Sequence, residues 1–449
     1  MSYIPHTDED RRAMLDAIGV DSIDDLFLDI PEELRIARLN MPDGLSEMDT
    51  LRHLRSLSER NAHLDEYVSF LGAGAYDHFI PSVVGAITSR GEFATAYTPY
   101  QPEVSQGTLQ AIFEYQSLIC ALTEMDVSNA SLYDGASATA EAALLALNVG
   151  RGRDEIVLLG GVHPEYRATV ETYLSGAAGE CIAAACDPAT GVTDLDALRG
   201  LVSDRTAGVV MQHPNFFGCL EPAAAIGEIA HGAGAQFIAN VNPISLALLQ
   251  PPGAYGADIV VGEGQPLGNE VSYGGPYLGF FAVTDKLMRR TPGRLVGETR
   301  DIEGRRANVL TLRAREQDIR REKATSNICT NQSLNALAAC VYMCAVGKQG
   351  IQEVAELCLR KAHYLRDRLC ELPGVEPEFS APVYHEFALR LPGEVDATMS
   401  ALADRGFLGG VPLGRFDDSL SDCALLAVTE RRTRAEMDRF VDAVAEVTA

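Results

Sequence analysis

The stretch from Gly256 to Ala282 reads GADIVVGEGQPLGNEVSYGGPYLGFFA, and its pattern decides how the middle of the chain folds. A short β-branched run leads into a polar loop, a tight glycine–proline turn and a second apolar run. This order predicts a strand, a loop and a second strand. The stretch contains no lysine: its loop offers Glu263 and Gln265, and the whole chain has only Lys286, Lys323, Lys348 and Lys361.

Short apolar runs alternate with helical patterns from Gly72 to about Asp285. This alternation predicts an α/β fold with a mostly parallel sheet that is covered on both faces. Ligands of such sheets bind at the carboxyl ends of the strands. The expected strands are 130–132, 155–159, 181–185, 208–212, 236–240, 259–261 and 278–283, and the expected helices are 138–147, 165–175, 195–201 and 223–232.

Two further regions flank this sheet. The first 71 residues predict a helical arm, because Thr7 and Ser46 can each cap an amphipathic helix, the second running to Leu71. Such an arm cannot bury its apolar stripe alone, so we expect it to wrap a partner surface. After a helical stretch at 327–346, strands at 385–391 and 425–428 and helices at 397–405 and 434–447 predict a smaller α/β lobe. We therefore expect an arm over 1–71, a large domain over 72–310 and a small domain over 311–449.

Composition narrows the class of protein. The formal net charge of −26 argues against nucleic acid as a ligand. No apolar run is long enough to span a bilayer, and the start MSYIPHTDEDRR lacks a signal-peptide pattern, so we expect a cytoplasmic protein without a membrane partner. The 10 cysteines lack paired zinc spacing and indicate reduced thiols, so no metal is expected. The acidity could also reflect a saline host.

Three short motifs are candidates for lining a ligand site. The run SLYDGASA passes from a strand through a glycine turn into a helix, so its amides can seat a phosphate or carboxylate. Taken alone, such a run is more often a plain helix cap. The loop YTPYQPE is stiffened by two prolines, and QHPN ends a strand with a histidine that is more often structural than catalytic.

Longer segments, taken together and in order, resemble one family. They are YTPYQPEVSQGTLQAIFEYQ, NASLYDGASATAEAAL, QHPNFFG, GADIVVGEGQPLG, SYGGPYLGFFAV, REKATSNICTNQSLNALAA and ALLAVTERRT. The resemblance covers nearly the full length and is to the glycine cleavage system P-protein, glycine dehydrogenase (decarboxylating). It implies a fold-type-I, pyridoxal-phosphate (PLP)-dependent transferase-like architecture. The opening YIPHTDEDRRAMLDAIGVDSIDDLF resembles the alpha subunit (subunit 1) of the two-chain form.

The chain departs from the active pattern of that family at two positions. In the beta subunit a His-Lys pair precedes the glycine-rich turn, and counting back from Gly274 places the lysine slot near Gln265, whose amide cannot form an imine. The strand that should end in a carboxylate beneath the pyridine nitrogen ends instead with Asn240 and Asn242. The resemblance therefore implies a chain with no catalytic residue of its own, whose PLP is carried by the beta subunit. Its vestigial pocket is expected to involve Asp134, Gly135, Ala136, Ser137, His213, Asn215 and Asn240.

The resemblance also implies an assembly, commonly α2β2. Glycine binds to PLP on the beta subunit and loses CO2, and the aminomethyl group passes to the lipoyl group of H-protein. In fold-type-I dimers each chain lends its neighbour's site a loop before the first strand and the turn after the lysine slot. These map to Tyr97, Thr98 and Tyr100, and to Ser272, Tyr273, Gly274 and Gly275, which we expect to contact the partner's site without acting as acids or bases.

Two alternatives stay open from the sequence. In the first, Lys323, which lies near a motif, would form the Schiff base of a self-sufficient PLP enzyme. Because Arg320 and Arg321 lie close to it, however, Lys323 is better explained as part of a basic cluster. The chain would otherwise be a purely structural subunit with no contact to the chemistry. The visible absorbance of an internal aldimine on the isolated chain distinguishes the first alternative from the others.

Overall fold

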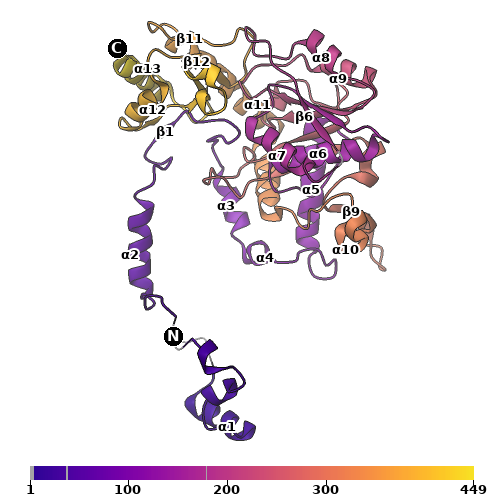
Figure 1. The fold of residues 1–449 in the computed structure, drawn as a ribbon, viewed down its shortest axis with the longest axis vertical. Helices are drawn as coiled ribbons and strands as arrows, with labels where there is room; N and C mark the ends of the chain where they lie inside the picture. The colour runs from indigo at the N-terminus through magenta and orange to yellow at the C-terminus, as the bar shows by residue number, and fades with distance from the viewer. Residues whose placement is uncertain (1–4, 37–38, 178, 449) are drawn as a thin grey trace. The chain divides into compact units, whose positions relative to one another are not determined.

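The computed structural model describes residues 5–36, 39–177 and 179–448 and divides the chain into two units, Met1–Ala62 and His63–Ala449 (Figure 1). Residues 1–4 and 37–38 of the expected arm, and residue 449 of the small domain, lie outside the described residues.

The first unit is helical. It contains α1 (Asp8–Ile18), η1 (Asp24–Phe27), η2 (Glu32–Leu34) and α2 (Glu47–Ser58). Thr7 and Ser46 cap α1 and α2 as predicted. The expected continuation of α2 to Leu71 is wrong, because the side chain of Asn61 donates to the carbonyls of Leu57 and Ser58 and closes the helix. Neither α1 nor α2 has a buried residue, so their apolar stripes stay exposed within this unit.

Residues from His63 onward belong to the second unit, which differs from the expected arm boundary at Leu71. The reason is β1 (Val68–Ser69), which pairs in parallel with β13 (Phe407–Leu408). Phe70 is fully buried in the hydrophobic core of the C-terminal lobe. Local periodicity does not reveal a two-residue strand of this kind, whose partner lies more than 300 residues away.

A seven-stranded sheet in the order β2-β8-β7-β6-β5-β3-β4 forms the centre of the second unit. Strands β4, β3, β5, β6 and β7 are parallel, and β8 runs antiparallel to both of its neighbours, β7 and the edge strand β2. The predicted mostly parallel sheet is confirmed. The strand expected at 130–132 is wrong, because Ser131 has a φ of 138° and Leu132 forms only an isolated bridge to Gly279. The strands are β2 (Val127–Ser128), β3 (Glu155–Leu158), β4 (Glu180–Ala183), β5 (Thr206–His213), β6 (Gln236–Val241), β7 (Ile259–Glu263) and β8 (Gly279–Val283).

Helices pack against this sheet much as the apolar periodicity predicts. Helix α6 (Gly135–Val149) contacts strands β3, β5, β6, β7 and β8. Helix α7 (Pro164–Leu174) packs beside α6, while α8 (Leu195–Leu201) and α9 (Ala223–Gly232) pack together near β5 and β6 (Figure 1). The bounds of α8 and α9 match the expected ones.

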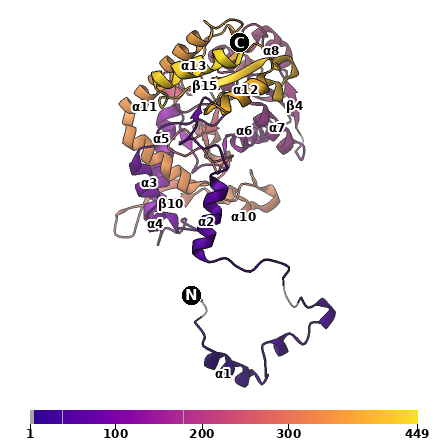
Figure 2. The ribbon, with the colours of Figure 1, turned by 90° about the vertical axis from the view of Figure 1, so that its left-hand side faces the viewer.

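The long helix α11 (Ser333–Leu369) joins the two cores of the second unit. It begins after the expected start at Asn327 and is interrupted at Gly347, where φ is 61°. Figure 2 shows it beside α5 (Gln106–Thr123) and α3 (Ser82–Thr88). In the described part of the chain it is the one helix long and apolar enough to cross a membrane by length and composition. Core helices of folded proteins meet the same criterion, and residues from both halves of α11 are buried in these cores.

The C-terminal lobe is built on a four-stranded antiparallel sheet in the order β11-β12-β15-β14. Helices α12 (Val395–Ala403) and α13 (Arg434–Thr448) pack together beside it. Its strands are β11 (Glu376–Pro377), β12 (Glu386–Arg390), β14 (Val411–Pro412) and β15 (Cys423–Ala427). The remaining elements are α4 (Gly91–Ala94), η3 (Ser245–Ala247), η4 (Asp285–Arg290), the hairpin β9 (Leu295–Arg300) and β10 (Arg306–Thr311), η5 (Arg313–Arg315), α10 (Gln317–Arg320), η6 (Arg321–Lys323), η7 (Leu413–Arg415) and η8 (Asp418–Leu420).

Candidate functional site

A cavity of about 40 Å³ lies where the parallel strands β5, β6 and β7 end. Gln212, Asn240 and Glu263 line it from those strands, and Tyr76 and Glu386 line it from segments remote in sequence. The position is the one predicted for a ligand in a sheet of this kind. A cavity of this size has room for water, but it is far below the roughly 300 Å³ typical of the smallest ligand pockets.

The predicted anion seat is present at the start of α6. Asp134 caps the helix and accepts a hydrogen bond from the backbone amide of Ser137 at 2.7 Å. Gly135 is needed for close packing, because a Cβ there would lie 2.6 Å from the hydroxyl of Tyr166. Ala136 follows in the first turn. The amide of Gly135 points to a carboxylate of the same chain, that of Glu263, at 3.0 Å.

Glu263 lies at the end of β7 and accepts three backbone hydrogen bonds. One oxygen accepts from Gly135, and the other accepts from Gln265 and Leu278, both at 2.9 Å. Burial raises the pKa of Glu263 to about 7, against the opposite effect of the three amides. The sequence identified Glu263 only as a loop residue, since nothing in its local pattern shows that it reaches the start of α6.

Gln265, the residue at the expected lysine slot, is buried and fully bonded. Its carbonyl oxygen accepts from the amide of Tyr76 at 2.9 Å. Its amide group donates to the carbonyl oxygens of Tyr76 at 3.0 Å and Asn269 at 2.8 Å. Only 1% of Gln265 is exposed. This side chain therefore holds the segment around Tyr76 against the end of β7.

The other pocket candidates have partners within the chain. Asn240 donates to the hydroxyl of Thr139 at 3.0 Å. His213 accepts from the amide of Glu221 at 3.1 Å, and burial lowers the pKa of this histidine to about 4. Asn215 donates to the Glu221 carboxylate at 2.8 Å and accepts from two backbone amides. Of these three, Asn240 and Asn215 line the cavity.

His385 and Glu386, at the start of β12, are among the buried pocket residues that the sequence analysis missed. Glu386 accepts from the amide of Ala73 at 2.6 Å and from the hydroxyl of Tyr76 at 2.8 Å. Burial raises its pKa to about 7. Neither ring nitrogen of His385 has a hydrogen-bond partner among the described residues. A charged residue within an apolar strand pattern is the one signal that could have pointed to Glu386.

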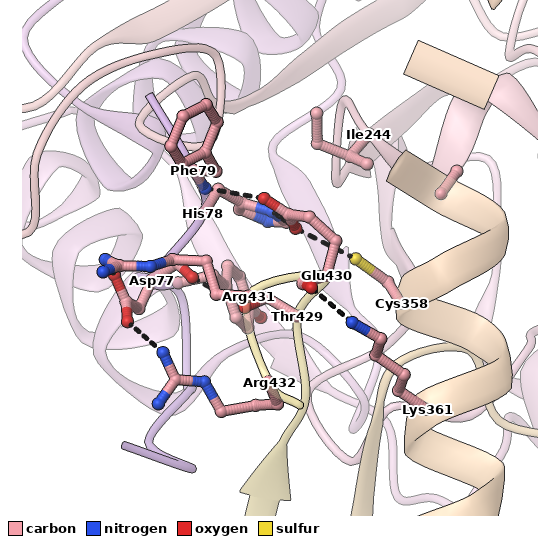
Figure 3. Close-up of polar contacts among 12 residues, drawn as sticks. Asp77, His78, Phe79, Ile244, Cys358, Lys361, Thr429, Glu430, Arg431 and Arg432 are labelled. Atoms are coloured by element: carbon pink, nitrogen blue, oxygen red, sulfur yellow. Dashed lines mark hydrogen bonds and ion pairs between the residues drawn. The ribbon is translucent and has the colours of Figure 1, made fainter. Parts of the chain in front are cut away.

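A network beside the pocket joins the segment 77–79 to the loop after β15 and to α11 (Figure 3). Glu430 accepts from the amide of Phe79 at 2.6 Å and pairs with His78 at 2.7 Å, while the Cys358 thiol donates to it at 3.5 Å. The amine of Lys361 donates to the Glu430 carbonyl. Burial opposes ionisation of Glu430, but the hydrogen bond and charge of His78, together with the backbone amide of Phe79, outweigh it and lower the pKa to about 2.

The trio His78, Cys358 and Glu430 is close enough to be considered as a metal site within the described residues. Its geometry favours a hydrogen-bonded network instead. The His78 and Glu430 atoms lie 2.7 Å apart, which is a hydrogen-bond distance, and burial raises the pKa of the Cys358 thiol. Metal ligation requires a thiolate, so the network acts as a clamp that holds residues 77–79 beside the pocket.

The expected interface loops differ in exposure. Tyr97 is 95% exposed and Tyr273 is 80% exposed, and Thr98, Ser272 and Gly274 are exposed beside them, with Gly275 half-buried. Tyr100 is engaged within its own chain: its hydroxyl lies 2.9 Å from that of Thr330 and donates to Asn331 at 2.8 Å. The guanidinium of Arg294 also lies over the Tyr100 ring. Tyr100 thus bonds to residues of its own chain, whereas the side chains of Tyr97 and Tyr273 are exposed to solvent in this chain.

Comparison with known proteins gives the family. The model of the glycine cleavage system P-protein family matches residues 1–444. This chain belongs to that family. It is 52% identical over 450 residues to the probable glycine dehydrogenase (decarboxylating) subunit 1 of Moorella thermoacetica, with 100% of both chains covered. It is 53% identical to the protein of the same description from Chlorobium limicola, with 99% and 100% covered.

Solved structures agree with the family. A crystal structure of glycine decarboxylase (P-protein) of the glycine cleavage system, in inhibitor-bound form, matches with a TM-score of 0.92 and 46% identity over 100% of both chains. Glutamate decarboxylase from Lactobacillus brevis matches with a TM-score of 0.69 over 94% and 97% of the two chains, at 13% identity. The second match shows the fold alone, which is the predicted fold-type-I architecture.

Proposed function

We propose that this chain is the subunit of glycine dehydrogenase (decarboxylating) that does not hold PLP, and that a beta-type partner carries the Schiff-base lysine. The observation that carries the proposal is Gln265. It stands at the lysine slot, it cannot form an imine, and both ends of its amide are bonded to the backbone. None of the four lysines lines the cavity; three are exposed, and Lys361 donates to Glu430.

The residues around the cavity also do not fit PLP. Asn240 stands where an acid would pair with the pyridine nitrogen, and it is already bonded to Thr139. The seat for a phosphate holds the carboxylate of Glu263. These features argue against the self-sufficient alternative, and exposed Lys323 lines no part of this cavity. No chemical step is therefore assigned to this pocket.

The complete enzyme, which we place in the cytoplasm, decarboxylates glycine on the partner and passes the aminomethyl group to the lipoyl group of H-protein. PLP supplies the electron sink for the carbon that loses CO2. This chain contributes exposed loops to the partner's active site. Tyr97 and Thr98 on one loop, and Tyr273 in the turn after the lysine slot, have the exposure that a loop reaching into a neighbour's site requires.

The exposed apolar side chains of the first unit favour an obligate partner, and we propose an α2β2 assembly. On α2 the side chains of Met48, Leu51, Leu54 and Leu57 recur every third residue and are 57%, 62%, 56% and 39% exposed. Burying one such side chain is worth about 1.5–3 kcal/mol, so an exposed row of four is costly unless another surface covers it. We assign that surface to the beta subunit.

Borohydride reduction of the copurified complex tests the proposal. The pyridoxyl label should be found on a lysine of the partner and on no peptide of this chain. A stoichiometric label on any of its four lysines contradicts the proposal. The scaffold alternative is tested separately, by comparing glycine turnover of complexes that contain Tyr97→Phe or Tyr273→Phe with the wild type.

A further inference from the structure

The backbone amides at the start of α6 need hydrogen-bond acceptors. A helix of this length carries partial positive charge at its first turn, and the first amides have no acceptor within the helix. Phosphate groups commonly fill such positions at the start of helices that follow a glycine turn. In this chain the amide of Ser137 is satisfied by the capping carboxylate of Asp134, and the amide of Gly135 is left for another acceptor.

The carboxylate of Glu263 supplies that acceptor. It lies 3.0 Å from the Gly135 nitrogen and also accepts from Gln265 and Leu278 at 2.9 Å. The two oxygens thus join the first turn of α6 to the end of β7 and the start of β8. Three backbone donors converge on one buried carboxylate, which is the arrangement that a bound phosphate or carboxylate ligand would show. Above its pKa of about 7 this carboxylate is an anion.

The backbone segments around this point are closely packed. A Cβ at Gly135 would lie 2.9 Å from the Glu263 nitrogen, and one at Gly279 would lie 2.3 Å from the carbonyl oxygen of Asp134. A Cβ at Gly264 would lie 2.9 Å from the side chain of Leu278. Glycines at these positions let the ends of β7 and β8 approach the start of α6 closely enough for a side chain to fill the seat.

We propose that Glu263 is a built-in anion that occupies the phosphate seat at the start of α6, so that this pocket is closed to phosphate-bearing ligands and the seat serves as a structural joint. The inference deepens the proposed function, because a closed seat explains why this chain leaves PLP to its partner, and it rests on that assignment only for this explanation. Removing the carboxylate should open an anion site that is latent in the wild type.

Chemical rescue of Glu263→Ala tests the inference. The substitution removes one methylene and one carboxylate, which acetate can replace atom for atom. The melting temperature of the full-length chain should fall by about 5 °C or more, because three buried amides lose their acceptor. Replacing chloride by acetate at constant ionic strength should restore at least half of that loss, whereas acetamide should restore none.

Val261→Ala is the matched control, since Val261 is a fully buried residue of the same strand. Its cavity is apolar, so its melting temperature should fall and acetate should not restore it. Glu263→Gln keeps the size of the side chain but turns an amide donor toward a backbone donor. It should lower the melting temperature and gain nothing from acetate, because the seat is still filled.

The outcomes separate this inference from the proposed function. No loss of stability in Glu263→Gln, or equal effects of acetate on Glu263→Ala and Val261→Ala, overturns the built-in anion. If Glu263→Ala is insoluble, the Glu263→Gln comparison still decides. The borohydride label reports on the Schiff-base lysine and not on the start of α6. A labelled lysine in this chain, together with acetate rescue of Glu263→Ala, would therefore refute the assignment of PLP to the partner but not the role of Glu263 as a built-in anion.

Discussion

Replacing Gln265 by leucine is the sharpest test of what stands in the lysine slot. Leucine has a similar size and no polar atoms, so the change removes hydrogen bonds with little change in volume. Gln265 is 1% exposed, and its amide satisfies the nitrogen of Tyr76 and the carbonyl oxygens of Tyr76 and Asn269. The Tyr76 carbonyl also accepts from the amide of His78 at 3.0 Å and so keeps one partner.

Two backbone groups are then left buried without a partner, the Tyr76 amide and the Asn269 carbonyl. Each such group costs about 1–3 kcal/mol, which predicts a loss of about 2–6 kcal/mol in the free energy of unfolding. This is a large part of the 5–15 kcal/mol typical of a folded domain. The segment around Tyr76 should also exchange its amide hydrogens faster, because its attachment to the end of β7 is lost.

Urea unfolding of the full-length chain measures this loss as a lower midpoint. Gln352→Leu is the control, because Gln352 is exposed on α11 and bonds only to Glu356 one turn away. That control should change the free energy of unfolding by less than about 0.5 kcal/mol. If Gln265→Leu is as stable as Gln352→Leu, the amide of Gln265 has no structural role and the reasoning fails.

Three further predictions follow from the pocket, the first unit and the exposed loops. Gln265→Lys should not yield a visible-absorbing PLP adduct in the isolated chain, because the phosphate seat stays filled; a stable borohydride-trapped adduct would contradict this. Leu51→Asp with Leu54→Asp should weaken co-elution with the partner by about tenfold or more while leaving the isolated chain as stable as the wild type, whereas full assembly would show that α2 is not the clamp. Tyr97→Phe should lower glycine turnover of the complex by about tenfold if its hydroxyl bonds a charged group there, and unchanged turnover would favour the scaffold alternative.

A fifth prediction concerns pH. The folded pKa of Glu386 is raised to about 7, so the folded chain keeps a proton that the unfolded chain has lost, and stability falls as pH rises from about 4.5 through 7. A shift of that size corresponds to up to about 3 kcal/mol. Glu386→Gln stays neutral and should lose less stability than the wild type between pH 5.5 and 8 in urea unfolding. Equal losses in the two proteins would show that Glu386 does not titrate in this range.

Local patterns predicted much of this fold. Helices α8 and α9 begin and end where the apolar periodicity places them, and the strands predicted at 208–212 and 236–240 form the centre of the sheet. The capping residues Thr7 and Ser46 also mark helix starts correctly. These features depend on neighbours within a few positions, which is the range over which periodicity and capping act. The end of α2 was wrong because a single side chain, that of Asn61, closes the helix.

The sequence by itself determined that the chain has a mostly parallel α/β sheet, that it resembles the P-protein family, and that the lysine slot holds Gln265. Only the tertiary structure decided what replaces the missing groups. Glu263 meets Gly135 across 128 positions, Gln265 meets Tyr76 across 189, and Glu386 meets Tyr76 across 310. Such bonds form only when the order of the strands brings distant chain segments within about 3 Å of each other. Local sequence patterns do not show which distant segments will meet in this way.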